Sequence, residues 1–166
     1  MKRTLALVTA LAVVLAVGVM AQGKTDFSGS WKRDATRSDT PQMGRGGPGG
    51  GAPAGDVTLT ITQTASEITF ERKTGENTQK GVYKLDGSES TITSPRGGEI
   101  KAKVNWEGAN LVIAATQTMN MGGNEMTSTS KETWSLGADG AITVQSTRTT
   151  PRGEMTSKTV YTKIAG

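Results

Sequence analysis

Apolar and polar side chains alternate with a period of two residues along much of this chain. The pattern is clearest in residues 57–62, 67–73, 100–106 and 142–145. Successive side chains of a β-strand point to opposite faces, so this alternation predicts strands with one apolar and one polar face. No segment after the first 21 residues keeps a helical period over two turns. The chain is therefore predicted to be all-β, with an antiparallel sheet.

Turn residues separate the alternating segments at the spacing of hairpins. Short turns are expected at 64–66, 86–87, 107–108 and 137–140, and longer connections at 34–56, 74–78, 94–98, 120–123 and 150–153. Short and long connections alternate, so an up-and-down meander would place all the long loops at one end. We expect about ten strands closed into a barrel, because closure removes exposed edges. They begin near Ser28, Val57, Glu67, Gln79, Glu89, Glu99, Asn110, Glu125, Ala141 and Glu154.

Residues 1–21 have the character of a secretory signal peptide. Lys2 and Arg3 provide the positive start, and an apolar stretch from Leu5 to Val19 follows. Small residues at its end predict cleavage before Gln22. A membrane anchor is the alternative, but a span needs about 20 apolar residues. We expect a periplasmic or secreted protein with no membrane span after cleavage.

Residues 22–166 suit a single domain, with a Gly/Pro-rich loop at about 40–55 that is expected to be flexible. Cleavage of the signal lowers the net charge from +4 to +2, which is too little and too spread for a nucleic-acid surface. The chain has no cysteine and no histidine. Disulfides, cysteine or histidine nucleophile systems and imidazole metal ligands are therefore excluded, and no cofactor or metal is predicted.

If the barrel closes, one face of each strand points inward. Apolar inward residues would be joined by small ones such as Ala102, Ser128 and Ser146. Small side chains leave volume unfilled, which favours a cavity, but they also suit the taper of a narrow solid barrel. Both interpretations stay open. The expected apolar wall of a cavity is Trp31, Phe70, Trp106, Ile113 and Trp134.

The same phase sends Arg72, Gln117 and Arg148 inward, each just before a long loop. They would ring the open mouth, joined by the loop residues Arg96 and Arg152. Guanidinium groups in a partly dry mouth suit a carboxylate or phosphate head group. The alternative is that these strand ends are simply polar and reach out to water.

Two short motifs carry a family resemblance. Phe27-Ser28-Gly29-Ser30-Trp31-Lys32 resembles the first strand of lipocalin and fatty-acid-binding (calycin) proteins, which implies a small ligand-carrying barrel whose floor Trp31 closes. Residues 158–163 resemble the last strand of intracellular lipid-binding proteins. There an arginine two residues before the tyrosine holds a carboxylate, but Thr159 stands at that position here. The second lipocalin signature and the two inserted helices are absent. More broadly, the chain is similar to small exported lipocalin-like proteins of bacteria.

The leading hypothesis is a monomeric, non-enzymatic exported protein that binds a small amphipathic or hydrophobic ligand. Its predicted site is the apolar wall together with the three mouth residues. The alternative is a structural or protein-interaction module of the bacterial envelope with a filled core. An outer-membrane barrel would need an apolar outer face, whereas the outward residues here include Lys73, Lys101 and Lys103. Catalysis would have to rely on carboxylates, lysine or tyrosine.

Overall fold

A computed structural model describes residues 23–39, 56–94, 98–121, 124–151 and 153–164 of the chain. The predicted signal peptide and the Gly/Pro-rich loop lie outside the described residues, as do Arg96 and Arg152. Among the described residues there is no helix, and hence none that could span a bilayer.

Ten strands make up the fold, as the alternation and the turn spacing predict. Their bounds are β1 Gly29–Arg33, β2 Val57–Gln63, β3 Glu67–Thr74, β4 Asn77–Lys84, β5 Ser90–Thr93, β6 Glu99–Glu107, β7 Asn110–Met121, β8 Asn124–Leu136, β9 Ile142–Thr150 and β10 Gly153–Lys163. Every pairing is antiparallel, and each strand pairs with the next except β4 with β5. β1 also pairs with β10, which bends the meander round on itself.

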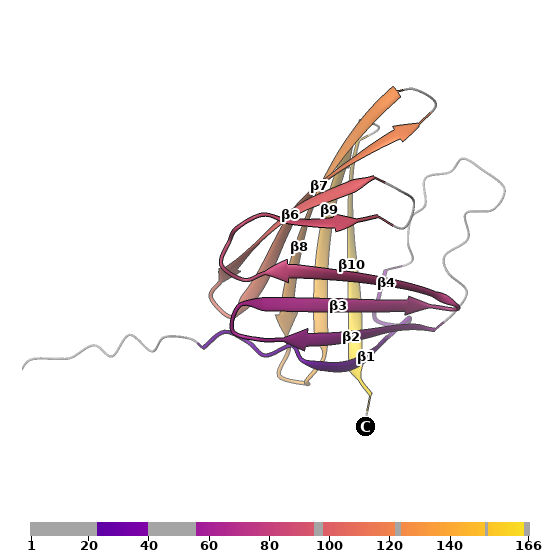
Figure 1. The fold of residues 1–166 in the computed structure, drawn as a ribbon. Helices are drawn as coiled ribbons and strands as arrows, with labels where there is room; N and C mark the ends of the chain where they lie inside the picture. The colour runs from indigo at the N-terminus through magenta and orange to yellow at the C-terminus, as the bar shows by residue number, and fades with distance from the viewer. Residues whose placement is uncertain (1–22, 40–55, 95–97, 122–123, 152, 165–166) are drawn as a thin grey trace, which may run out of the picture.

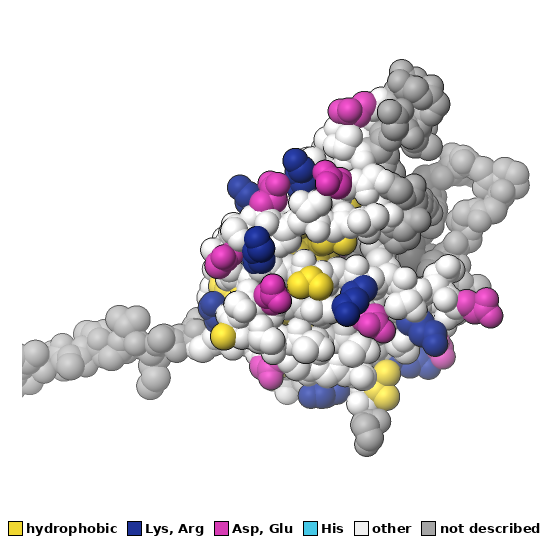
Figure 2. Space-filling view, viewed as in Figure 1, with side chains coloured by type: hydrophobic (Ala, Val, Ile, Leu, Met, Phe, Trp, Pro, Cys, Tyr) yellow, Lys and Arg dark blue, Asp and Glu magenta, His cyan; other side chains and the backbone are white. Residues whose placement is uncertain are grey.

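The barrel is nearly closed, and its opening lies between β4 and β5 (Figure 1). These two strands lie side by side without forming a ladder. β5 has only four residues, and the Lys84 backbone N–H donates to the Ser90 hydroxyl at 2.9 Å instead of to a backbone carbonyl. Figure 2 shows apolar side chains at the surface in this region, among charged side chains of both signs.

A solid core fills the end of the barrel with the short turns. Phe27 is fully buried there, and Trp31 is 2% exposed. The Trp31 indole N–H donates to the Phe27 carbonyl at 3.0 Å, so the one polar atom of this ring is satisfied. Phe27 also stacks on Trp106, with 6.2 Å between the ring centroids. The tryptophan of the first-strand motif therefore lies in the floor of the barrel.

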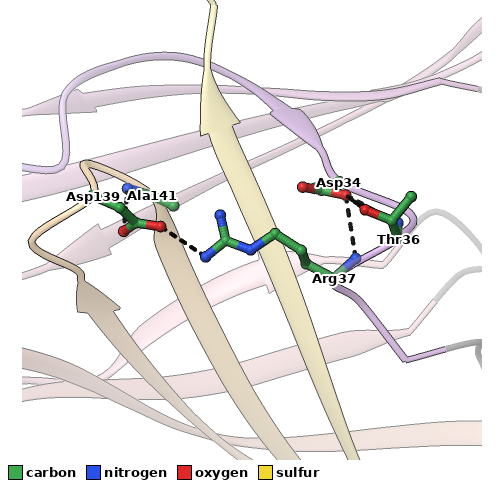
Figure 3. A network of polar contacts seen from close by, with 5 residues as sticks. All are labelled: Asp34, Thr36, Arg37, Asp139 and Ala141. Atoms are coloured by element: carbon green, nitrogen blue, oxygen red, sulfur yellow. Dashed lines mark hydrogen bonds and ion pairs between the residues drawn. The ribbon is translucent and has the colours of Figure 1, made fainter.

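Residues 34–39 continue the contact of β1 with β10. β1 has five residues and β10 has eleven, so β1 cannot pair along the whole of its neighbour. The Asp34 backbone N–H donates to the Val160 carbonyl, and the Ser38 hydroxyl accepts from the Val160 N–H at 2.9 Å. Figure 3 shows how Arg37 reaches across β10 to Asp139, in the turn before β9, at 2.7 Å. Residues 34–39 thus form a strap along the edge of β10, beyond the end of β1.

Candidate functional site

A cavity of about 250 Å³ lies inside the barrel. Of the two alternatives that the sequence leaves open, the structure shows a cavity above a solid floor. Its apolar lining is Leu59, Phe70, Ile92, Ile100, Ile113, Ala115 and Trp134, and its polar lining is Arg72, Gln79, Tyr83, Ser130, Glu132 and Arg148, with Gly81 between them. All these residues have the inward phase of their strands, because a β-strand presents every second side chain to the same face.

Aromatic rings in mutual contact form one wall of this cavity. Phe70 on β3 lies 4.7 Å from Trp134 on β8 and 5.4 Å from Tyr83 on β4, measured between ring centroids. Trp134 in turn stacks on Tyr161 at 6.3 Å. Gly81 gives the Tyr83 ring its place, because a β-carbon at Gly81 would lie 3.0 Å from the Tyr83 Cε2 atom. The rings are therefore positioned by their contacts with one another and by the lack of a side chain at Gly81.

The Arg72 side chain is surrounded by other residues of the barrel, and it is exposed to solvent only because it lines the cavity. Desolvation lowers its pKa, but Tyr161, Glu132 and Tyr83 together outweigh that effect and raise it, with help from a side-chain hydrogen bond to Tyr161. Arg72 therefore stays charged inside the barrel.

Tyr83 is affected by the same surroundings. Burial raises its pKa to about 12, the Glu132 carboxylate adds to that rise, and Arg72 opposes it. Its hydroxyl is thus neutral at physiological pH. It can both donate and accept a hydrogen bond at the edge of the cavity.

A second polar cluster lies nearer the end with the long loops. The Arg148 Nη2 atom donates to the Ser128 hydroxyl at 3.2 Å and to the Gln117 side-chain oxygen at 3.4 Å. Gln117 then donates to the Ser94 hydroxyl at 3.0 Å. Arg148 and Gln117 are therefore brought together, as the predicted mouth requires, whereas Arg72 lies in a separate group with Tyr83 and Tyr161.

The structure divides the predicted site residues between the cavity and its surroundings. Phe70, Arg72, Ile113, Trp134 and Arg148 line the cavity. Trp31 and Trp106 are not in the lining: they belong to the floor, where the Trp106 indole N–H is buried and has no hydrogen-bond partner among the described residues. Gln117 holds Arg148 without lining the cavity itself. The ligand-binding role of all eight residues remains a prediction.

Sequence reasoning missed Glu132 and Tyr83 as cavity residues. Glu132 lies two residues before Trp134, in the phase that also points Ser128 and Ser130 inward, so the alternation alone was enough to place it. Among the described residues, no group of three acidic side chains is arranged to hold a metal ion.

Several solved structures with the same architecture are named for ligand binding or transport. The zebrafish ileal bile acid-binding protein complexed with cholic acid is 18% identical, with a TM-score of 0.60, over 83% of this chain and 98% of its own. Lipid binding protein 8 of Caenorhabditis elegans is 17% identical, with a TM-score of 0.59, over 90% and 100%. The REP1-NXSQ fatty acid transporter is 15% identical, with a TM-score of 0.57, over 84% and 96%.

These likenesses show the fold, which is that of the calycin-type β-barrels, and they confirm the resemblance drawn from the first-strand motif. The proteins concerned are named for binding or transport. In sequence, no family model and no curated protein matches this chain.

Proposed function

We propose that this protein is an exported, non-enzymatic carrier that holds a small amphipathic ligand in its barrel cavity. The observation that carries the proposal is a charged arginine, Arg72, facing the same 250 Å³ space as an aromatic wall built on Phe70 and Trp134. An acidic head group with a short apolar tail matches both features. The barrels of similar architecture, named for bile acid, lipid and fatty acid, support the same class of ligand.

Arg72 suits a head group because it forms no ion pair with any described carboxylate. A guanidinium has five N–H donors, and the hydrogen bond with Tyr161 occupies only part of that capacity. A carboxylate could accept two parallel hydrogen bonds from it. Arg148 is the weaker candidate, since its guanidinium already donates to Ser128 and Gln117.

Export is the part of the proposal that rests on residues 1–21 alone. Those residues have the charge and apolar pattern of a signal peptide. Expression of the full chain in a bacterial host tests it: the protein recovered outside the cytoplasm should begin at Gln22. Recovery of the full-length chain in the cytoplasm would contradict export without affecting the binding site.

Mass spectrometry of the exported protein tests the cavity. Under native conditions we expect an excess mass that disappears on denaturation, which would reveal a bound small molecule. Protein recovered without one can be titrated with octanoate, following the intrinsic tryptophan fluorescence, to which Trp134 contributes from the cavity wall. Arg72→Gln should weaken octanoate binding by about tenfold or more, because a charge-assisted hydrogen bond contributes about 1.5–3 kcal/mol.

Lys73→Gln is the matched control, since it removes the same charge from the neighbouring exposed residue on the outer face of β3. Its octanoate affinity should equal that of the wild type. No excess mass together with no octanoate binding would overturn the proposal, and it would favour a structural or protein-interaction module.

A further inference from the structure

Glu132 is a carboxylate inside the barrel that the proposed carrier function does not use. It lies on β8 and lines the cavity one inward position from Trp134. The Trp134 indole N–H donates to its Oε2 atom at 3.0 Å, which fixes the carboxylate beside the aromatic wall. Among the described residues, no hydrogen bond or ion pair uses the other oxygen of this carboxylate, so that oxygen is able to accept a hydrogen bond.

Arg72 and Glu132 enter the same cavity from strands that are not neighbours in the sheet, β3 and β8. They are near enough to influence each other electrostatically. Yet no ion pair joins Glu132 to any lysine or arginine of the described residues. The cavity therefore presents a cation and an anion with space between them.

Two opposite charges that are not paired with each other, Arg72 and Glu132, favour a ligand that binds both of them. A charge taken out of bulk water is costly unless it is paired or hydrogen-bonded. A simple fatty acid would satisfy Arg72 and bring a second negative charge towards Glu132. A simple amine would do the reverse, because it would approach the guanidinium.

We propose that the cavity selects a zwitterionic amphiphile, with its carboxylate on Arg72, its ammonium group on Glu132 and a short apolar tail against Phe70 and Trp134. This inference rests on the proposed carrier function and names its ligand class. Selectivity here arises as much from repulsion of the wrong charge as from attraction of the right one. The cavity volume of about 250 Å³ limits the tail to medium length.

Three probes with the same carbon chain test the inference: octanoate, octylamine and 2-aminooctanoate. Their dissociation constants are measured by calorimetry on the intact exported protein. We expect 2-aminooctanoate to bind about tenfold more tightly than either of the others, because it adds one charge-assisted hydrogen bond. Equal or tighter binding of octanoate would overturn the inference and leave the carrier function standing.

The Glu132→Gln variant tests whether Glu132 is responsible for the preference for 2-aminooctanoate. This variant should lose the preference for 2-aminooctanoate and bind octanoate at least as tightly as the wild type does. Glu71→Gln, an exposed change on the outer face of β3, is the control and should keep the preference. A preference that survives in Glu132→Gln would overturn the assignment. If that variant does not fold, the ranking of the three probes on the wild type decides. Binding of none of them to protein that also shows no excess mass would overturn this inference and the carrier function together.

Discussion

At the scale of single residues, the floor of the barrel and its cavity depend on different kinds of side chain. Trp31 in the floor is held by packing and by one hydrogen bond to the Phe27 carbonyl. Tyr83, at the edge of the cavity, has its hydroxyl among charged groups, with Arg72 and Glu132 both acting on its pKa. The first residue therefore contributes to stability, and the second responds to pH.

Trp31→Ala should lower the free energy of unfolding by about 3–5 kcal/mol, because it leaves a large cavity where the indole is 2% exposed. Urea denaturation of the two proteins measures the difference. Trp31→Phe is the companion variant, and it should cost less because it keeps a ring in the floor. A loss below about 1 kcal/mol for the alanine variant would contradict burial of this residue.

The raised pKa of Tyr83, about 12, predicts a loss of stability at alkaline pH. In the unfolded chain a tyrosine ionises near pH 10, whereas the folded protein keeps this hydroxyl neutral for about two further pH units. The stabilising effect is complete below pH 10 and declines as the pH rises through 12. Wild type should therefore lose stability relative to Tyr83→Phe over that interval, as measured by urea unfolding at several pH values. A constant difference between the two would contradict the shift.

At the scale of elements, the strap completes what the short strand β1 leaves open. β10 needs partners for the backbone groups that β1 does not reach, and residues 34–39 supply them through backbone and side-chain contacts. The Asp39 carboxylate accepts from the Lys158 N–H at 2.6 Å, next to the Ser38 contact with Val160. A tight connection between β1 and β2 could not provide this cover.

Ser38→Ala should therefore speed hydrogen exchange at the Val160 amide by about fivefold, the equivalent of about one hydrogen bond. Asp39→Ala should do the same at Lys158. Exchange rates measured by NMR, residue by residue, give the result. Ser66→Ala, in the exposed turn before β3, should leave both amides unchanged. If all three variants exchange alike, the strap does not protect β10.

At the scale of the whole molecule, the barrel is a single sheet that curls until β1 meets β10 and stops short of joining β4 to β5. The strand count, the antiparallel order and the alternation of short and long connections all follow from the sequence pattern. The opening between β4 and β5 does not follow from that pattern. The four-residue β5 alternates as the other strands do, and only its short length distinguishes it. The effect of the opening is to leave apolar side chains at the surface on that side of the barrel (Figure 2).

Which face of each strand turns inward can be predicted from the amino-acid sequence, because alternation is a local property of the backbone. The sequence thereby indicated that Phe70, Arg72, Ile113, Trp134 and Arg148 share one interior. The height along the barrel at which each inward residue lies could not be predicted in this way, and the three-dimensional structure was needed to find it. That height depends on the register of strands paired across the whole chain, which no local pattern encodes. For this reason Trp31 and Trp106 lie in the solid floor, while Arg72 and Glu132, from non-adjacent strands, meet around the same space.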